Sequence, residues 1–216
     1  MSTQFKFVFF VRFLGYFLFF IGLTTILVVL TPVIGAELFF RKDKLFNVER
    51  TVPKAKVGFG ELGLRENIIT PVSTDFGVVI EKINANSLIL PNIDPLNETE
   101  YTQALGKGVA HAKGSDFPGS GGNIYLFSHS TDAPWNLVRF NAVFYLLREL
   151  NTGDRVILFY NGRRFDYKVF DKIVVEPEDT GYLTNKYDEE VLTLQTCDPP
   201  GTRLKRLIVR AKLEGT

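Results

Sequence analysis

An uninterrupted apolar segment, residues 13–35, constrains this chain more than any other feature of its sequence. It contains no charged residue, and as a helix rising ~1.5 Å per residue it would be about 35 Å long. That length is enough to cross a hydrocarbon layer of ~30 Å with some tilt. A cleaved signal peptide usually has a shorter apolar region and a small-residue cleavage site, and the Ile34 to Ala36 stretch matches such a site poorly. We therefore predict a retained membrane anchor.

The anchor divides the sequence into four parts. Residues 1–12 form a short N-terminal tail, 13–35 the transmembrane anchor, 36–75 a stalk or linker, and 76–216 a folded domain. Basic residues flank the anchor on both sides, so the positive-inside rule does not set its orientation. A short tail on one side and a whole domain on the other are compatible with a single-pass protein whose domain lies outside the cytoplasm.

Composition excludes several classes of protein. Of the 216 residues, 45% are apolar and 23% are charged, which is typical of a folded chain rather than a disordered one. The net charge is +1, so no basic field for nucleic acid is indicated. The length suits one domain of ordinary size in addition to the anchor.

From residue 76 onward the pattern is rich in β-strands. Short runs of β-branched and aromatic residues are separated by turn signals such as Asn161-Gly162. The predicted strands are 78–83, 124–127, 156–160, 165–170, 191–196 and 207–213. Many short strands at this spacing favour a closed or nearly closed β-barrel.

Two segments have helical character. Phe140, Val143, Phe144 and Leu147 follow the i, i+3, i+4, i+7 spacing, which predicts a helix over 139–149. A shorter helical turn is predicted over 99–105, and the Gly, Ser and Pro residues of 113–122 predict a loop between the two.

Cys197 is the only cysteine in the sequence, which excludes an intramolecular disulfide and a Cys-rich metal site. If the segment before it is a strand, Leu192 and Leu194 share one face, while Thr193 and Gln195 share the other face with Cys197. A cysteine buried as a small hydrophobe would be expected beside the leucines. Cys197 is therefore a candidate nucleophile at a strand end, where loops often carry function.

Three further residues are candidates for a site around Cys197. If the last two strands pair as a hairpin, Arg206 returns close to Cys197, where a cation favours the thiolate. A cysteine nucleophile usually needs a basic partner, most often histidine, and the sequence contains only His111 and His129. On this argument either histidine could serve, and each could instead be a structural hydrogen-bonding group.

The order of these residues resembles the sortase family. The segment Thr193-Leu194-Gln195-Thr196-Cys197 is similar to that family's Thr-Leu-x-Thr-Cys nucleophile motif, and Arg206-Leu207-Ile208-Val209 is similar to its arginine strand. Upstream, Gly108-Val109-Ala110-His111 and Ser128-His129 follow in the family's order. The resemblance covers roughly 77–213, and the N-terminal anchor is of the family's kind.

The resemblance implies a mainly β fold, a closed barrel of about eight strands with one or two short helices. It implies a cysteine transpeptidase in which Cys197 is the nucleophile, His129 the general acid and base, and Arg206 a group that steadies the substrate or its oxyanion. The positions that would line the substrate site are Thr193, Gln195 and Thr196. No metal or organic cofactor is implied.

The implied substrate is a secreted protein with a C-terminal LPxTG-like sorting signal. The incoming amine would belong to a cell-wall peptide or to a pilin lysine. The protein would be a single-pass cell-membrane protein with its catalytic domain outside the cytoplasm, and it would contact the lipid bilayer through its N-terminal helix.

Two alternatives remain on the sequence alone. One is a hydrolytic cysteine peptidase, in which water replaces the amine; a papain-like enzyme fits less well, because there the cysteine precedes the histidine along the chain. The other is a non-catalytic binding module tethered to the membrane. The intact histidine, cysteine and arginine favour an enzyme over the binding module.

Overall fold

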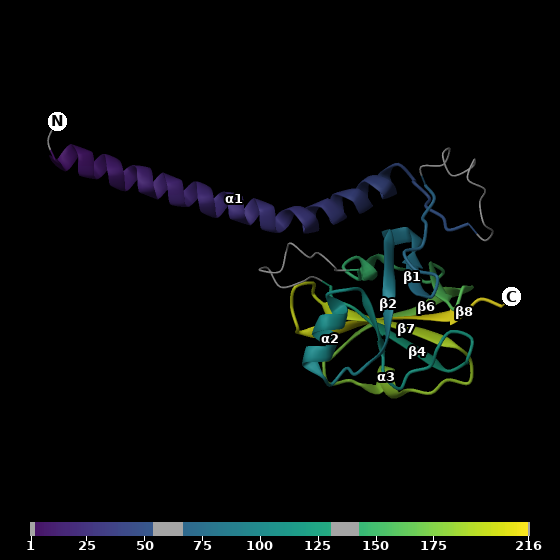
Figure 1. Ribbon diagram of the computed structural model, residues 1–216. Coiled ribbons are helices and arrows are strands. Elements are labelled where there is room, and N and C mark those ends of the chain that lie inside the picture. The colour runs from purple at the N-terminus through teal and green to yellow at the C-terminus, as the bar shows by residue number, and fades with distance from the viewer. Residues whose placement is uncertain (1–2, 54–66, 131–142, 216) are drawn as a thin grey trace.

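The computed structural model describes residues 3–53, 67–130 and 143–215. Within these ranges, eight strands close into one barrel, and a long helix extends away from it (Figure 1). The strands are β1 (Phe76–Ile80), β2 (Ala85–Ile93), β3 (Val109–Ala112), β4 (Asn123–Phe127), β5 (Arg155–Tyr160), β6 (Arg163–Val175), β7 (Val191–Asp198) and β8 (Lys205–Leu213). The helical elements are α1 (Thr3–Leu45), η2 (Glu81–Ile83), α2 (Glu98–Leu105), η4 (Leu147–Glu149) and α3 (Gly181–Thr184).

The barrel order is β1-β2-β3-β4-β7-β8-β6-β5, with β5 closing on β1. Two neighbouring pairs, β2 with β3 and β4 with β7, are parallel, and the other pairs are antiparallel. The β5–β6 hairpin has the predicted Asn161-Gly162 turn. Both turn residues have positive φ, 50° and 73°, which is the backbone that a two-residue hairpin of type I′ requires.

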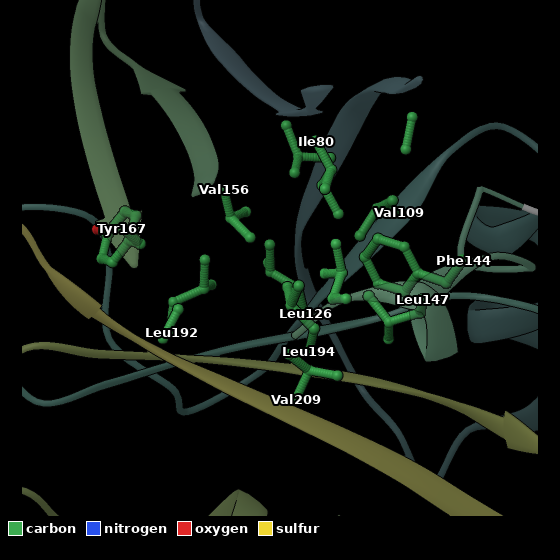
Figure 2. Packing of buried hydrophobic residues seen from close by; sticks show 14 of the residues in the cluster. Ile80, Val109, Leu126, Phe144, Leu147, Val156, Tyr167, Leu192, Leu194 and Val209 are labelled. Carbon is green, nitrogen blue, oxygen red and sulfur yellow. The ribbon is translucent and has the colours of Figure 1, made fainter. Parts of the chain in front are cut away.

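Alternate side chains of every strand fill the barrel. Ile80, Leu126, Leu192 and Val209 are among the buried residues that meet at its centre (Figure 2). Phe144 and Leu147, from the segment before β5, pack into the same cluster. Fully burying one such side chain stabilises the fold by roughly 1.5–3 kcal/mol, so this cluster is the main source of the barrel's stability.

A second apolar cluster lies on the outer face of β3 and β4. It contains Tyr125 and Phe127 from β4, and α2 contributes Ala104 and Leu105. The segment containing α3 adds partly buried side chains on the same face. Both faces of β4 are therefore covered along its length, which explains why every residue of this strand is buried.

Most of the predicted β pattern is confirmed. All six predicted strands are present, with ends that differ by a few residues, and the short helical turn is α2. The predicted helix over 139–149 is wrong for the part that the structure describes, because 143–146 form turns and only η4 follows. Residues 139–142 of that prediction lie outside the described residues. The apolar residues of this segment fill the barrel instead of forming a helix face, since Phe144 and Leu147 are fully buried in the central cluster.

Helix α1 is longer than the predicted anchor and runs ten residues beyond position 35. Among the described residues, it is the one helix long and apolar enough to cross a membrane, over Phe7–Val28, and the side chains described there are exposed. Near its C-terminal end Phe40 is buried and belongs to the central cluster of the barrel. The end of α1 is therefore packed against the domain.

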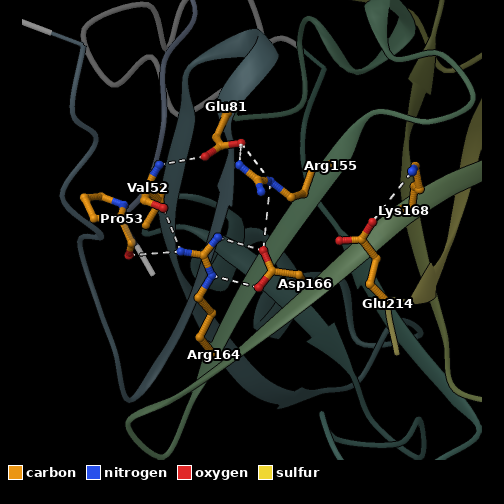
Figure 3. A network of polar contacts seen from close by, with 8 residues as sticks. All are labelled: Val52, Pro53, Glu81, Arg155, Arg164, Asp166, Lys168 and Glu214. Carbon is orange, nitrogen blue, oxygen red and sulfur yellow. Dashed lines mark hydrogen bonds and ion pairs between the residues drawn. The ribbon is translucent and has the colours of Figure 1, made fainter. Parts of the chain in front are cut away.

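The predicted stalk also packs against the barrel at both of its described ends. Thr51 bridges Ile68, and Val52 and Ile69 are buried against the outer face of β1 and β5. We call the two described pieces that lie on the barrel, residues 51–53 and 67–69, the strap, and Figure 3 shows the polar contacts around residues 52 and 53. The N–H of Val52 donates to Glu81 Oε1 at 2.6 Å, and the carbonyl oxygens of the strap accept hydrogen bonds from a residue of β6.

Arg164 is the partner from β6. Its Nη1 donates to the carbonyl oxygens of Val52 at 2.7 Å and Pro53 at 3.0 Å, while its other nitrogens pair with Asp166 (Figure 3). These bonds satisfy backbone groups of the predicted stalk and hold residues 51–53 against the barrel.

Candidate active site

Three adjacent strands bring the candidate catalytic residues into one row. Cys197 on β7 lies directly opposite Arg206 on β8 in the antiparallel pairing. On the other side of β7, the parallel strand β4 places Phe127 opposite Gln195. The predicted hairpin between the last two strands is thereby confirmed.

His129 follows β4 by two residues, and two hydrogen bonds continue the strand register toward it. The N–H of Ser128 donates to the Gln195 carbonyl at 3.1 Å, and Thr196 Oγ1 donates to the Ser128 carbonyl at 2.9 Å. One further step in this register places His129 beside Cys197. Neighbouring strands are about 4.8 Å apart, so the backbone positions of these residues are adjacent.

The row lies on the outer face of the barrel. On β7, Leu192 and Leu194 belong to the central cluster, so Cys197 has the opposite, outward orientation. On β8, Leu207 and Val209 point inward, which gives Arg206 the outward orientation. The inward side chains of β4 are Ile124 and Leu126, and the same alternation turns the His129 position outward. All three candidates therefore share one face.

Cys197 is a free thiol and is half-buried. It is the last residue but one of β7, so the sequence prediction of a strand end is confirmed. Part of the residue is therefore accessible to solvent, as a nucleophile at a strand end requires.

Arg206 has no carboxylate partner among the contacts of the described residues. Its Nη1 donates to the carbonyl oxygens of Arg203 at 3.3 Å and Lys205 at 3.2 Å, both in its own hairpin. Arg210, four residues later on the same face, is instead paired with Asp171 at 2.7 Å. Arg206 is therefore the arginine of this strand whose charge is available to a bound group.

His111 is a structural residue in this fold. It is fully buried on β3, its Nδ1 accepts from the Asn92 N–H at 3.2 Å, and its Nε2 lies 3.0 Å from the Asp116 carbonyl. Because Nδ1 accepts, Nε2 carries the proton and donates. Burial lowers the pKa of His111, and the hydrogen bond and charge of Asp116 offset part of that effect. His129 is the remaining histidine, as the family order implies.

The three predicted substrate-lining residues differ in exposure. Thr193 is fully buried and its Oγ1 donates to Asn123 Oδ1 at 2.8 Å, while Thr196 is buried and holds the Ser128 carbonyl. Gln195 is half-buried and accepts a hydrogen bond from Tyr125 on β4. The threonines thus connect β7 to β4, and Gln195 is the one of the three with exposed surface.

Tyr125 is a residue of the site that the sequence analysis did not predict. Its place between the apolar residues Ile124 and Leu126 on a strand could have indicated that its side chain faces outward. Burial raises the pKa of its hydroxyl above the ordinary value, Arg206 lowers it, and Asp179 raises it. Its hydroxyl donates to Gln195, and Tyr182 and Leu183 of α3 pack on the cluster that contains its ring, so the phenol lies between the candidate row and α3. Among the described residues, no cluster of His, Cys, Asp and Glu side chains could hold a metal ion.

Comparisons with known proteins agree with this arrangement. The model of the sortase domain matches residues 78–214. Sortase D of Bacillus subtilis (strain 168) is 32% identical over 136 residues, which cover 62% of this chain and 60% of that protein. The chain therefore aligns with less than two thirds of the length of that curated relative.

Two solved structures from Clostridium perfringens are also similar. A sortase D5 transpeptidase has 25% sequence identity and a TM-score of 0.53, over 74% of this chain and 91% of that one. A sortase C solved with the C-terminal cell wall sorting motif has 26% identity and a TM-score of 0.54, over 65% of this chain and 70% of that one. With the sortase domain matched over more than half of its length, the chain belongs to the sortase family.

Proposed function

We propose that this protein is a membrane-anchored cysteine transpeptidase. The observation that carries the proposal is the row of His129, Cys197 and Arg206 on one face of three adjacent strands, in a chain of the sortase family. The three residue types supply a nucleophile, an acid and base, and a cation, which are the groups that acyl transfer through a thioester requires.

The first half of the reaction is acylation of the sulfur. The Cys197 thiolate attacks the carbonyl carbon of the scissile peptide bond and forms an S–C bond. Arg206 stabilises the negative charge that develops on the carbonyl oxygen. As the C–N bond breaks, protonated His129 gives its proton to the leaving amine, so a thioacyl enzyme and a free amine result.

The second half transfers the acyl group. An incoming amine attacks the thioester carbon and loses a proton to neutral His129, and the C–S bond breaks to release the thiolate. A new amide bond is formed and the histidine is again protonated. Attack by water instead would release a carboxylic acid, which is the hydrolytic alternative.

Two polar side chains support the row. Thr196 holds the Ser128 carbonyl and thereby fixes the backbone that leads into His129. Gln195 presents its amide group on the outer face. The Gln195 oxygen accepts a hydrogen bond from the Tyr125 hydroxyl, so the Gln195 N–H groups remain to donate to a substrate carbonyl. An extended peptide laid along this face would meet both donors of the site, Gln195 and Arg206.

The substrate class is a secreted protein with a C-terminal LPxTG-like sorting signal. Support comes from the sortase C of Clostridium perfringens, which was solved with a C-terminal cell wall sorting motif. The acceptor would be an amine of a cell-wall peptide or a pilin lysine. Helix α1 would span the cell membrane and keep the barrel on the extracytoplasmic side.

The test uses the full chain in detergent micelles with a small library of LPxTG-like peptides, with and without a glycine peptide as amine. We expect wild-type protein to give the amide product, detected by mass spectrometry, and Cys197→Ala protein to give none. Hydrolysed peptide in the presence of amine would instead indicate a peptidase. Binding without any cleavage would favour the tethered binding module.

A further inference from the structure

The segment 176–190, which connects β6 to β7, lies against the outer face of the barrel close to the candidate row. Asn123 on β4 donates from Nδ2 to the Tyr182 carbonyl at 2.9 Å. Tyr182 and Leu183 pack against the outer cluster that contains Tyr125 and Phe127. The segment therefore covers part of the outer face of β4, beginning at its first residue.

This segment is also coupled to the residues nearest the row. Val175, the last residue of β6, pairs with Arg206 in the strand register, and Glu176 pairs with Lys205 at 3.0 Å. Tyr182 packs on the outer cluster that contains Tyr125, whose hydroxyl donates to Gln195, two residues before Cys197. The segment thus borders the outer surface around Gln195 and Cys197, which we call the peptide-binding surface. A shift of the segment would change this border without touching the sulfur.

Arg210 on β8 connects the segment to the barrel wall. Its Nη1 donates to the Tyr187 hydroxyl at 3.2 Å, and its Nε and Nη2 pair with Asp171 on β6 at 3.0 and 2.7 Å. Its guanidinium lies over the rings of Phe170 and Tyr182, 5.1 and 5.5 Å from their centroids. This one side chain of β8 therefore contacts β6 and two tyrosines of the segment.

Among the described contacts, the neighbouring cations on β8 do not bond both to β6 and to a tyrosine of the segment, as Arg210 does. Arg206 contacts only carbonyl oxygens of its own hairpin among the described contacts. Lys212 also reaches the segment, because it pairs with Glu189 at 2.6 Å and lies over the Phe170 ring at 5.3 Å, but the two paired side chains are largely exposed, at 45% and 64%. Exposed ion pairs contribute little, whereas a planar guanidinium that donates from two nitrogens to one oxygen of Asp171 and lies over two rings holds a fixed geometry.

We propose that Arg210 is a positioning residue that fixes segment 176–190 as the border of the peptide-binding surface. The proposal rests on the proposed transpeptidase function and adds a residue that the nucleophile and arginine motifs do not contain. Arg210 does not contact the reacting groups, so its loss should weaken peptide binding and leave the chemistry at Cys197 intact.

The test compares steady-state kinetics of full-length variants in detergent micelles, with an LPxTG-like peptide and a glycine amine. For Arg210→Ala we expect KM for the peptide to rise about tenfold, with kcat within about twofold of wild type. Arg210→Lys keeps the charge but loses the fork, so its KM should lie between the two. Lys212→Ala is the matched control, and its KM should change by less than about twofold.

Tyr187→Phe is a second, milder variant that tests the same contact if Arg210→Ala does not fold. It removes one hydroxyl from the segment and leaves the Arg210–Asp171 pair, and it should raise KM about threefold. Hydrogen exchange supplies a readout without substrate: amides of 180–187 should exchange faster in Arg210→Ala and Tyr187→Phe, while those of β7 and β8 keep their protection.

The outcomes separate the two proposals. An unchanged KM in Arg210→Ala and Tyr187→Phe, from a wild-type protein that turns over, would overturn the role of Arg210 alone. A fall in kcat together with slower alkylation of Cys197 by iodoacetamide would also overturn it, because Arg210 would then act on the reacting groups. A wild-type protein that gives no product with any peptide would overturn the proposed function, and the role of Arg210 with it.

Discussion

Arg203 and Arg206 are three residues apart in the β7–β8 hairpin, but only Arg206 lies opposite Cys197. We expect Arg206→Ala to lower kcat/KM by about 10²–10³-fold, the range seen when one donor to an oxyanion is removed. Arg203→Ala should stay within about twofold, because its charge is on the loop before the strand. Peptide-cleavage kinetics on both variants test this prediction. A larger loss of activity in Arg203→Ala than in Arg206→Ala would show that Arg203, and not Arg206, has the role.

Cys197→Ala should abolish cleavage without loss of the fold. The side chain is half-buried at a strand end, so removal of one sulfur leaves no large internal cavity. We expect a change in the free energy of unfolding of less than about 1 kcal/mol. Circular dichroism during urea unfolding measures it. A variant that still cleaves the peptides would exclude Cys197 as the nucleophile.

His111 should contribute a pH dependence to stability. Burial lowers its pKa in the folded state below the ordinary value of 6.5, so the unfolded chain binds more protons. The stability that neutral His111 provides is therefore complete above about pH 6.5 and declines as the pH falls toward the lowered folded value. Urea unfolding between pH 7.5 and 5 should show this decline in wild type.

The control for that measurement is His111→Gln, which keeps a donor for the Asp116 carbonyl but has no titrating group. It should be less stable at pH 7.5 by about 1–3 kcal/mol, because the Asn92 N–H loses its acceptor. The part of the pH slope that belongs to residue 111 should disappear. An identical slope in both proteins would mean that other groups cause it.

Single residues differ in how far their sequence predicted their place. The side-chain alternation before Cys197 predicted its outward face, because a period of two follows directly from strand geometry. The burial of Thr193 and Thr196 could not be predicted in the same way, since it depends on Asn123 and Ser128 of a strand seventy residues earlier. Long-range partners of this kind have no local signal.

At the scale of elements, strands with strong β-branched patterns were predictable and two others were not. β2 reads Ala-Asn-Ser-Leu-Ile-Leu-Pro-Asn-Ile, in which polar residues and Pro91 weaken the pattern, and β3 is four residues long. Both form because the barrel must close, with β3 pairing in parallel to β2 and antiparallel to β4. Closure is a property of the whole sheet and is absent from either segment alone.

The strap before β1 should contribute to stability. Ile69 is buried against Val79, Ile157 and Phe159, so Ile69→Ala should lower the free energy of unfolding by about 2–4 kcal/mol. Val72→Ala is the matched control, since Val72 is 62% exposed, and it should cost less than about 0.5 kcal/mol. Equal values for the two variants in urea unfolding would show that the strap does not stabilise the barrel.

At the scale of the whole molecule, the anchor and barrel predicted from the sequence are joined more closely than a free stalk would allow. Phe40, near the end of α1, belongs to the central cluster, and Arg50 pairs with Asp43 at 2.8 Å. The strap then covers β1 and β5 before the barrel begins. Contacts of this kind restrain how the barrel is oriented relative to the helix.

The intact mass of the full chain after brief exposure to an LPxTG-like peptide tests most directly whether Cys197 forms a thioacyl enzyme. We expect a mass increase equal to the acyl part of the peptide, located on Cys197 by digestion and removed when a glycine amine is added. An acyl adduct on another residue, or amide product formed by Cys197→Ala protein, would exclude Cys197 as the nucleophile.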